Sequence, residues 1–337
     1  MRLFMNKPLK YAVFGAGSWA TAIVKMLCEN LDEVGWYMRS VYAKEHLLKE
    51  HHNPNYLSSV EFHIEQLKLS NDINEIADYA DVLIFVIPSA FIYGELQKMT
   101  VDISNKIIVS AVKGIIPESG LLVGEHFHEY YKIPYHDIAV IAGPCHSEEV
   151  ALERLSYLTI SCSDAKKAQI IASALSSNYI KAKISDDIIG VEYAVMLKNI
   201  YAIAAGIAHG LGYGDNFQSV LMSNSIREMK RFIKKMHKMK RNINDSAYLG
   251  DLLVTGYSLF SRNRMFGNMI GKGYTVKSAQ MEMSMVAEGY YATKNAHLLN
   301  EKNKKKTRLP IINAVYEILY EGKDPKSTFK KLTDKLD

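Results

Sequence analysis

Near the N-terminus the sequence reads Tyr11-Ala12-Val13-Phe14-Gly15-Ala16-Gly17-Ser18-Trp19-Ala20. The first four residues predict a buried strand, and the apolar spacing of Trp19–Asn30 predicts a helix directly after the turn. At such a junction Gly15 permits the tight turn, and Gly17 lets the backbone approach a diphosphate that the N-terminus of the helix stabilises. Glycines also serve purely structural turns, but their place at the first strand-helix junction favours a dinucleotide-binding domain.

The first half of the chain alternates short apolar runs with amphipathic stretches, which is typical of a parallel sheet covered by helices. The expected strands are Lys10–Phe14, Glu33–Met38, Val82–Ile87, Lys106–Ser110 and Ile138–Ile141, with Tyr157–Ser161 and Tyr179–Ile184 extending the sheet. Besides the first helix, Val41–Glu50 and Asp164–Ser177 have helical spacing. We therefore expect an α/β fold with an N-terminal Rossmann-like dinucleotide-binding domain.

The second half of the chain shows long helical patterns and few strand signals. The expected helices are Gly190–His209, Asn216–Met239, Ser278–Asn300 and Leu309–Glu321. No Pro-, Gly- or Ser-rich linker separates the halves, so the boundary rests on the change of periodicity alone. This boundary predicts a dinucleotide-binding domain over residues 1–188 and an all-helical substrate-binding and catalytic domain over residues 189–337.

Composition limits the classes of partner. The 337 residues include 41 Lys and Arg against 36 Asp and Glu, a net charge of +5 that is too mild to indicate a nucleic-acid binder and suits a small anionic substrate. The basic run Lys230–Arg241 is interpreted as the solvated side of a helix, because apolar residues recur beneath it at helical spacing. We therefore expect no nucleic-acid partner.

The same composition bears on compartment and metals. Cys28, Cys145 and Cys162 are too few and too far apart for a disulfide framework or a Cys-x-x-Cys metal site, which favours a reducing cytoplasm and no metal. The longest apolar stretch, Val191–Leu211, contains charged and polar residues that a bilayer tolerates poorly. No integral membrane segment is expected.

The second predicted strand ends near Arg39, where NAD-selective folds usually place an acidic residue for the ribose hydroxyls. An arginine at this position suits the 2′-phosphate of NADP, although a solvated arginine at a strand end is an equal alternative. The sequence favours NADP and leaves NAD open.

Two lysines stand out as candidates for chemistry. Lys113 precedes Gly114 at the carboxyl end of a predicted strand, where ligands bind in open α/β sheets. Lys198 and Asn199 interrupt an apolar helical run, so we expect Lys198 to be partly buried rather than extended into solvent. Desolvation and nearby positive charge would favour its neutral form, which a general base requires.

Two further segments, Gly250-Asp251-Leu252 and Ser261-Arg262-Asn263-Arg264, lie in loop-like surroundings. The guanidinium of Arg262 and the amide of Asn263 could bind a phosphate group, because arginine offers a planar pair of donors that matches an oxyanion. Adjacent arginines are more often surface groups, so this segment is weak evidence when taken alone.

Taken together, these segments resemble the NAD(P)-dependent glycerol-3-phosphate dehydrogenases, in the same order and over nearly the whole chain. The resemblance rests on Gly15-Ala-Gly-Ser-Trp-Ala-Thr-Ala22, Ser110-Ala-Val-Lys-Gly114, Gly143-Pro144, Leu197-Lys-Asn199, Gly250-Asp-Leu252, Ser261-Arg-Asn263, Gly271-Lys-Gly273 and Val286-Ala-Glu-Gly289. The sequence departs from the family at Ala20, which replaces a glycine, and at Cys145-His146-Ser147, where the family more often has Ser or Thr, Phe and Ala.

The resemblance implies roles for individual residues. Lys198 matches the catalytic acid/base. The substrate site is expected to include Lys113, Gly143, Cys145, Asn199, Asp251, Ser261, Arg262 and Asn263. Cofactor contacts are expected from Gly15, Gly17, Ser18, Trp19, Arg39, Lys113, Ser147, Arg262, Val286 and Glu288.

The activity that the resemblance implies is reversible hydride transfer between NAD(P)H and a phosphorylated three-carbon substrate, interconverting dihydroxyacetone phosphate and sn-glycerol 3-phosphate for phospholipid synthesis. A cytoplasmic homodimer is expected. Two alternatives stay open from the residues: a related two-domain dehydrogenase of hydroxy acids or ketopantoate-like substrates, and a non-catalytic NADP(H) sensor.

Overall fold

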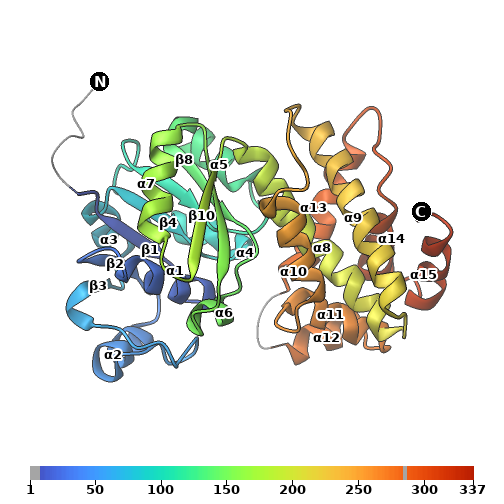
Figure 1. The fold of residues 1–337 in the computed structure, drawn as a ribbon, viewed down its shortest axis with the longest axis horizontal. Helices are drawn as coiled ribbons and strands as arrows, with labels where there is room; N and C mark the ends of the chain where they lie inside the picture. The colour runs from blue at the N-terminus through green and yellow to red at the C-terminus, as the bar shows by residue number, and fades with distance from the viewer. Residues whose placement is uncertain (1–7, 284–286) are drawn as a thin grey trace. The chain divides into compact units, whose positions relative to one another are not determined.

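The computed structural model describes residues 8–283 and 287–337. By contacts it divides into two compact units, one containing the chain up to Val112 together with Ile116–Ile188, and the other containing Lys113–Ile115 together with Ile189–Asp337. The first is built on a sheet and the second on helices (Figure 1). The α/β class and the helical second part predicted from the sequence are confirmed.

An eight-stranded sheet forms the centre of the first unit, with the strand order β10-β9-β8-β5-β4-β1-β2-β3. Its strands are β1 (Tyr11–Phe14), β2 (Val34–Tyr37), β3 (Leu67–Ser70), β4 (Val82–Phe85), β5 (Ile107–Ser110), β8 (Ile138–Ala142), β9 (Ser156–Cys162) and β10 (Ile180–Ser185). Five neighbouring inner strands, β8, β5, β4, β1 and β2, are buried along their whole length and pair parallel with one another, as expected for strands covered on both faces.

The sheet differs from the prediction in two respects. β3 was not predicted, because Leu67-Lys68-Leu69-Ser70 is a short alternating run without the continuous apolar character of the other strands. The sheet is also mixed rather than fully parallel, since β9 pairs antiparallel with β8 while β10 runs parallel to β9. Apolar content predicts that a strand exists and carries no information on its direction. A separate pair, β6 (Ile115–Ile116) and β7 (Leu121–Leu122), was also missed.

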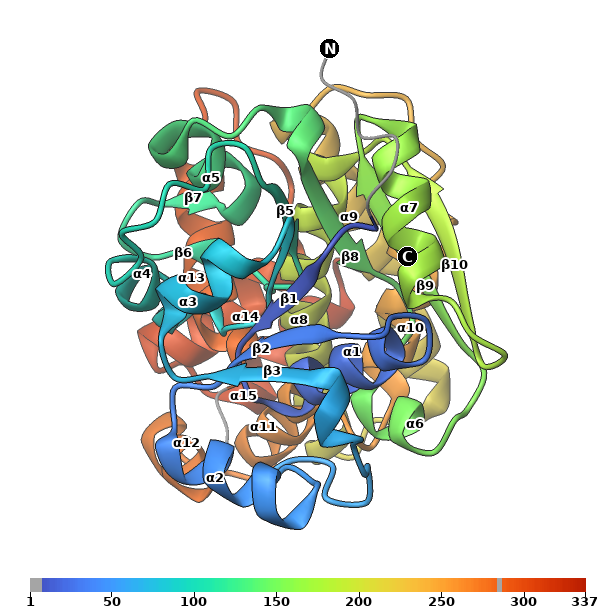
Figure 2. The same ribbon diagram turned by 90° about the vertical axis from the view of Figure 1, so that its left-hand side faces the viewer.

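Helices cover both faces of the sheet. Those of this unit are α1 (Ser18–Cys28), α2 (Val41–Glu50), α3 (Ile73–Tyr79), α4 (Ser89–Leu96), α5 (Val123–Tyr131), α6 (Ser147–Ala151) and α7 (Ala165–Leu175). α1 packs with α6 and α7 as well as on β1 and β2, α3 packs on β1, β2 and β3, and α5 packs on β5 and β8 (Figure 2). Local sequence sets several helix starts, since Ser40 and Asp164 each accept backbone N–H groups as N-caps.

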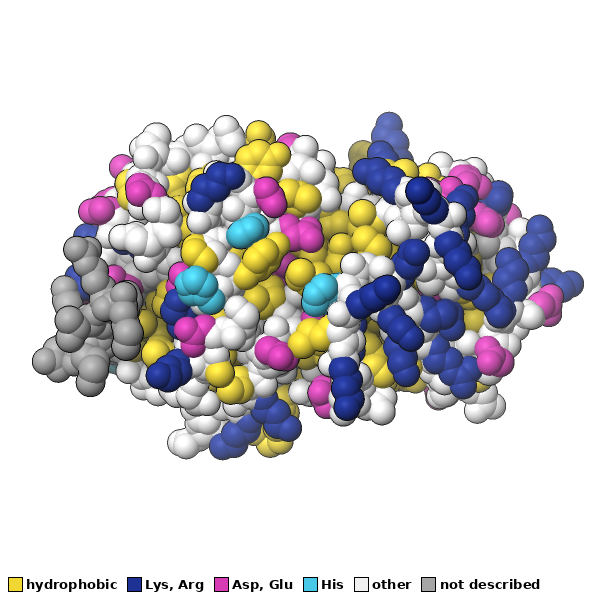
Figure 3. Space-filling model, turned by 90° about the horizontal axis from the view of Figure 1, so that it is seen from above, with side chains coloured by type: hydrophobic (Ala, Val, Ile, Leu, Met, Phe, Trp, Pro, Cys, Tyr) yellow, Lys and Arg dark blue, Asp and Glu magenta, His cyan; other side chains and the backbone are white. Residues whose placement is uncertain are grey.

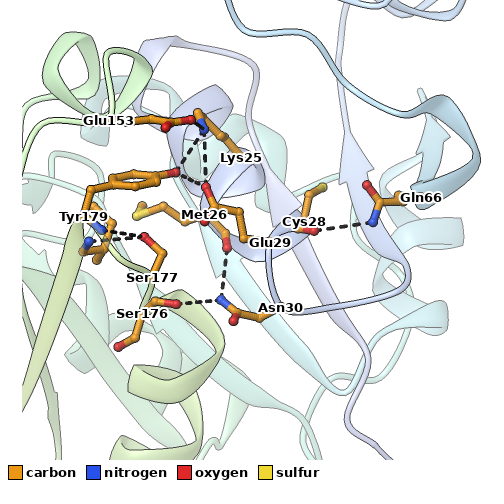
Figure 4. Close-up of polar contacts among 11 residues, drawn as sticks. Lys25, Met26, Cys28, Glu29, Asn30, Gln66, Glu153, Ser176, Ser177 and Tyr179 are labelled. Carbon is orange, nitrogen blue, oxygen red and sulfur yellow. Dashed lines mark hydrogen bonds and ion pairs between the residues drawn. The ribbon is translucent and has the colours of Figure 1, made fainter.

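Polar contacts near the end of α1 hold this helix against the segments that precede β9 and β10 (Figure 4). The Nζ of Lys25 donates to Glu153 Oε1 at 2.9 Å and to the Tyr179 hydroxyl at 3.0 Å. The Nδ2 of Asn30 donates to the carbonyls of Ala174 and Ser176 at 3.1 and 2.8 Å. These contacts fix the far end of the helix whose N-terminus follows the glycine-rich turn.

The second unit is helical. Its helices are α8 (Ile188–Gly210), α9 (Asp215–Met236), α10 (Asp251–Tyr257), α11 (Arg262–Gly271), α12 (Val276–Glu282), α13 (Glu288–Glu301), α14 (Pro310–Glu321) and α15 (Pro325–Thr333). Among the described residues, α8 is the one helix long and apolar enough to cross a membrane, and it is 94% buried over its most apolar window. That burial is typical of a core helix, and length and composition alone are weak evidence for a membrane span.

Glycines let α8 and α11 approach each other closely. A Cβ added to Gly206 would lie 2.0 Å from the carbonyl oxygen of Arg264, and one added to Gly267 would lie 2.1 Å from that of Ile203. Gly210 and Gly271 meet in the same way one turn further along. Because neither helix has room for a side chain here, the backbone of α11 packs directly on α8.

The predicted single helix Ser278–Asn300 was wrong, because α12 ends at Glu282 and α13 begins at Glu288. The backbone N–H of Gly289 donates to Asn263 Oδ1 at 2.8 Å, whereas in a continuous helix it would be committed to the carbonyl four residues earlier. Gly289 also lies so close to α8 that a Cβ would be 2.6 Å from the Asn199 carbonyl oxygen. Tertiary contacts thus override the helical periodicity of this segment.

The basic run in the second unit lies mostly on the surface. Lys230, Arg231, Lys234 and Lys235 are exposed along α9, while Phe232 and Ile233 are buried beneath them. This pattern confirms the interpretation of a solvated helix side, although α9 ends at Met236 and not at Met239 as predicted. Figure 3 shows Lys and Arg side chains gathered over this unit.

Candidate active site

The glycine-rich turn joins β1 to α1 in the first unit and borders open space at Gly17. Gly15 has a φ of +128°, and a Cβ there would lie 2.8 Å from the carbonyl oxygen of Val86, so both conformation and space require glycine. A Cβ on Gly17 would meet nothing within 4 Å, so the backbone borders open space at that point. Ala20, which departs from the family pattern, is fully buried.

The N-terminus of α1 can bind an anion. Ser18 and Trp19 open the helix, and its N-cap, Gly17, makes no side-chain capping hydrogen bond. The first N–H groups of a helix have no partner within the helix, and the helix dipole favours negative charge there. Glycine-lined open space next to these donors fits the diphosphate of a dinucleotide.

Arg39 follows β2, with 73% of its side chain exposed, and its guanidinium lies 3.7 Å from Glu95 Oε1. Glu95, a buried residue of α4, also accepts hydrogen bonds from the Tyr37 hydroxyl at 2.7 Å and from Lys98 Nζ at 2.8 Å. Burial disfavours the carboxylate, but the hydrogen bonds from Lys98 and Tyr37 outweigh it and lower the pKa of Glu95. Glu95 was not predicted from the sequence, because two of its partners, Tyr37 and Arg39, lie more than 50 positions away.

The other predicted residues of the first unit follow β8. Gly143 has a φ of +121°, and a Cβ there would lie 2.6 Å from the carbonyl oxygen of Tyr157. Cys145 is half-buried. Ser147 is the first residue of α6, and its hydroxyl donates to Glu148 Oε2 at 3.1 Å.

In the second unit, Lys198 forms a buried ion pair. Its Nζ lies 2.5 Å from Asp251 Oδ1, and the side chains of both residues are at most 9% exposed. The partial burial of Lys198 agrees with the expectation from its apolar neighbours, whereas its partner Asp251 was not predicted. Asp251 is held in turn by its position at the start of α10, where the Thr255 hydroxyl donates to its backbone carbonyl at 2.7 Å.

Three elements meet through the amide of Asn263. Its Nδ2 donates to Asn199 Oδ1 on α8 at 2.9 Å, and its Oδ1 accepts the N–H of Gly289 on α13 at 2.8 Å. Asn199 also donates from Nδ2 to the carbonyl of Val195 at 3.2 Å. These bonds orient the residues next to Lys198, Arg262 and Glu288 in the sequence. They also engage both the Nδ2 and the Oδ1 of Asn263, a residue that the sequence predicts as a ligand of the phosphate.

Lys113 lies among charged groups of this unit. Burial lowers the pKa of its ammonium group to about 8, with further lowering by Lys198 and Arg262 and opposing contributions from Glu288 and Asp251. Burial raises the pKa of Glu288 above its usual value, and the nearby positive charges of Lys113, Arg262 and Lys198 offset only part of this increase. The three cations Lys113, Lys198 and Arg262 therefore interact with two carboxylates, those of Glu288 and Asp251. The excess of positive charge suits an anionic ligand.

The structure thus places the predicted residues in two groups, one in each unit. In the helical unit, charge interactions or hydrogen bonds link Lys113, Lys198, Asn199, Asp251, Arg262, Asn263 and Glu288. Ser261 serves as the N-cap of α11, its hydroxyl accepting the N–H of Arg264 at 3.3 Å. Val286 lies outside the described residues. Within the described part of the chain, no group of three or more His, Cys, Asp and Glu side chains is arranged to hold a metal ion.

Comparison with known families matches both parts of the chain. Residues 10–168 match the N-terminal domain of NAD-dependent glycerol-3-phosphate dehydrogenases, and residues 187–330 match the C-terminal domain. A glycerol-3-phosphate dehydrogenase [NAD(P)+] from an Exiguobacterium species is 34% identical over 323 residues, covering 95% of this chain and 94% of the relative. The enzyme of the same name from Bacillus subtilis is 34% identical over 325 residues, covering 96% and 93%.

Solved structures agree with the sequence comparisons. A crystal structure of glycerol-3-phosphate dehydrogenase from Coxiella burnetii superposes with a TM-score of 0.87 at 28% identity, covering 96% of this chain and 98% of that one. A D-mandelate dehydrogenase shares the fold with a TM-score of 0.59 at 15% identity. The ordered motifs, both domain matches and these relatives lead to one conclusion: the chain belongs to the NAD-dependent glycerol-3-phosphate dehydrogenase family.

Proposed function

We propose that this protein interconverts dihydroxyacetone phosphate and sn-glycerol 3-phosphate with Lys198 as the catalytic acid/base. Family membership supports the reaction and its nicotinamide cofactor, NAD or NADP. The observation that carries the assignment of Lys198 is its buried ion pair with Asp251. The reaction then supplies the three-carbon phosphate backbone for phospholipid synthesis.

The chemistry assigned to Lys198 follows from its surroundings. Reduction of the C2 carbonyl needs a proton donor for the oxygen as negative charge develops, and an ammonium group meets this need. Asp251 holds the Nζ of Lys198 in one position and keeps a compensating charge beside it. The cofactor supplies the hydride when bound. In the reverse reaction, neutral Lys198 accepts the proton of the C2 hydroxyl.

The phosphate group of the substrate is assigned to Arg262 and Lys113, with Asn263, Ser261 and Asn199 as further lining residues of the helical unit. Gly143 and Cys145 of the first unit remain proposed substrate contacts. Arg262 opens α11 and interacts electrostatically with Lys113. Residues 189–337 contain 24 Lys and Arg against 13 Asp and Glu, so the helical unit attracts anions as a whole. Asn263 contributes mainly by orienting Asn199 and the backbone of α13.

A pH dependence of substrate binding follows from Lys113. Its lowered pKa of about 8 means that the ammonium is present below this pH and is lost as the pH rises through it. The KM for dihydroxyacetone phosphate should therefore rise about tenfold between about pH 7 and about pH 9. Initial rates across this range measure it. In the Lys113→Arg variant, whose guanidinium stays charged, the rise should disappear, and an unchanged profile in that variant would rule out Lys113 as its source.

Cofactor preference is assigned to Arg39, which we place against the 2′-phosphate of NADP. Arg39→Ala is expected to raise the KM for NADPH about tenfold or more and that for NADH less than about twofold, because only the 2′-phosphate loses a charged partner. Initial rates of dihydroxyacetone phosphate reduction with each cofactor test this. If the KM values for NADPH and NADH changed by the same factor, Arg39 would be a solvated surface residue with no contact to the 2′-phosphate.

The two alternatives from the sequence are not favoured. The D-mandelate dehydrogenase comparison shows the fold alone, and the family match covers both domains. Turnover of dihydroxyacetone phosphate measured beside a panel of 2-keto acids, including ketopantoate, tests the substrate class directly. A wild-type protein that bound NADPH and turned over none of these would be a sensor.

We further propose a cytoplasmic homodimer. In the part of the chain that the structure describes, no disulfide joins the three cysteines, which suits a reducing compartment. The proposal of a homodimer rests on the family resemblance. Light scattering of the purified protein measures the molar mass in solution and thus the number of subunits.

A further inference from the structure

The three carbonyl groups of the glycine-rich turn are all held by hydrogen bonds from outside the turn. The Nε1 of Trp36, on β2, donates to the Gly15 carbonyl at 2.7 Å. The Nδ2 of Asn53, in the segment after α2, donates to the Ala16 carbonyl at 3.0 Å. The Gly17 carbonyl accepts the backbone N–H and the hydroxyl of Thr21 at 2.9 and 3.1 Å.

Asn53 and Thr21 form a relay whose direction is fixed. The amide of Asn53 is fully buried, and its Nδ2 also donates to Thr21 Oγ1 at 3.0 Å. Its Oδ1 accepts the N–H of Asn55 at 3.0 Å, so the donor end of the amide must face the turn. Because Thr21 Oγ1 accepts from Asn53, its own hydrogen is directed to the Gly17 carbonyl.

Holding these carbonyls also sets the direction of the N–H groups. In a trans peptide plane, the C=O of one residue and the N–H of the next point in opposite directions. With the carbonyls of Gly15, Ala16 and Gly17 bound to Trp36, Asn53 and Thr21, the N–H groups of Ala16, Gly17 and Ser18 point away from these partners. Gly17 borders open space, and Gly17 and Ser18 form the uncapped start of α1.

We propose that Thr21, Asn53 and Trp36 are positioning residues that preorganise the N–H groups of the turn for the diphosphate of the cofactor. They act through the peptide planes of residues 15–18. The inference rests on the proposed function only in that the protein binds a dinucleotide. The glycine motif itself lies within one turn, whereas Thr21, Trp36 and Asn53 come from α1, β2 and the segment after α2. Preorganised donors bind an anion more tightly because they lose less freedom on binding.

A matched pair of variants at Thr21 separates positioning from packing. Thr21→Val keeps the branched shape and removes the hydroxyl, whereas Thr21→Ser keeps the hydroxyl and leaves a void the size of a methyl group. We expect Thr21→Val to weaken NADPH binding about tenfold, which is the effect of losing one neutral hydrogen bond. Thr21→Ser should stay within about twofold of the wild type, even though its unfolding temperature falls.

The experiment is calorimetric titration of each protein with NADPH and with adenosine 2′-phosphate, which lacks the diphosphate, alongside the kcat at saturating NADPH. Loss of NADPH affinity in Thr21→Val, with adenosine 2′-phosphate affinity and kcat within about twofold, supports the inference. Equal losses for the two ligands, no loss for NADPH, or a loss in Thr21→Ser that matches Thr21→Val would overturn it.

A variant at Asn53 adds an independent readout. Asn53→Asp keeps the size of the side chain and replaces the donor that faces Ala16 and Thr21 with an acceptor, so it should weaken NADPH binding more than Thr21→Val does. Affinity equal to that of the wild type would overturn the role of Asn53. Failure of the wild type itself to bind NADPH would instead contradict the proposed cofactor, and the two failures are therefore distinguishable.

Discussion

Replacing Lys198 with Ala is expected to lower the kcat for dihydroxyacetone phosphate reduction by about 10³-fold, because the reacting oxygen loses its proton donor. Binding of NADPH should stay within about twofold of the wild type, since the residues assigned to the diphosphate lie in the turn before α1. Absorbance of the reduced nicotinamide gives the rate, and titration with NADPH gives the affinity. An Ala variant that kept more than about a tenth of the wild-type kcat would remove Lys198 from the catalytic role.

The substitution also breaks the buried ion pair with Asp251, which can cost about 3–5 kcal/mol of stability. A second variant, Lys198→Arg, keeps a positive charge beside Asp251 and cannot exchange its proton near neutral pH. We expect it to remain folded and to show a comparable loss of kcat. Lys230→Ala, at an exposed position on α9, is the control for removing a lysine elsewhere and should leave kcat unchanged.

Gly267→Ala is expected to lower the free energy of unfolding by about 3 kcal/mol. The new methyl group would lie 2.1 Å from the carbonyl oxygen of Ile203, and neither backbone can yield without moving α11 on α8. Since α11 begins with Arg262 and Asn263, the same movement should also lower activity in the protein that remains folded. Urea denaturation followed by circular dichroism measures the stability, and initial rates measure the activity.

The matched control for that substitution is Gly94→Ala in α4. Gly94 is exposed, and a Cβ there would meet nothing within 4 Å. Alanine has the higher helix propensity, so this variant should be about 0.5–1 kcal/mol more stable than the wild type. If Gly267→Ala behaved like Gly94→Ala, the close packing of α8 on α11 would not be needed for stability.

The first part of the fold was predictable because its signals are local. The run Tyr11–Phe14 followed by glycines gave the first strand, the turn and the start of α1. The direction of β9 was not predictable, because an apolar run is the same when read from either end. The start of α13 at Glu288 was not predicted, because the contacts of Gly289 with Asn199 and Asn263 join residues that lie far apart in the sequence.

For the site as well, features that depend on neighbouring residues were predictable from the sequence, and contacts between distant residues were not. The burial of Lys198 follows from its apolar neighbours on one helix, and its ion pair with Asp251 joins residues that are 53 positions apart. Asn53 could be recognised as a turn residue before Pro54, but its hydrogen bond to the Ala16 carbonyl spans 37 positions. A single sequence shows which side chains are suited to a task, and the fold decides which of them meet.

Lys113 lies between β5 and β6 along the chain, yet it belongs by contacts to the helical unit. A fragment starting at residue 189 would therefore lack the ammonium group that faces Glu288 and Arg262. For the same reason, exchanging whole halves between relatives at residue 188 would pair the Lys113 of one protein with the carboxylate and guanidinium of another. A cut at residue 188 would therefore not separate the two units cleanly, because Lys113–Ile115 belong by contacts to the helical unit.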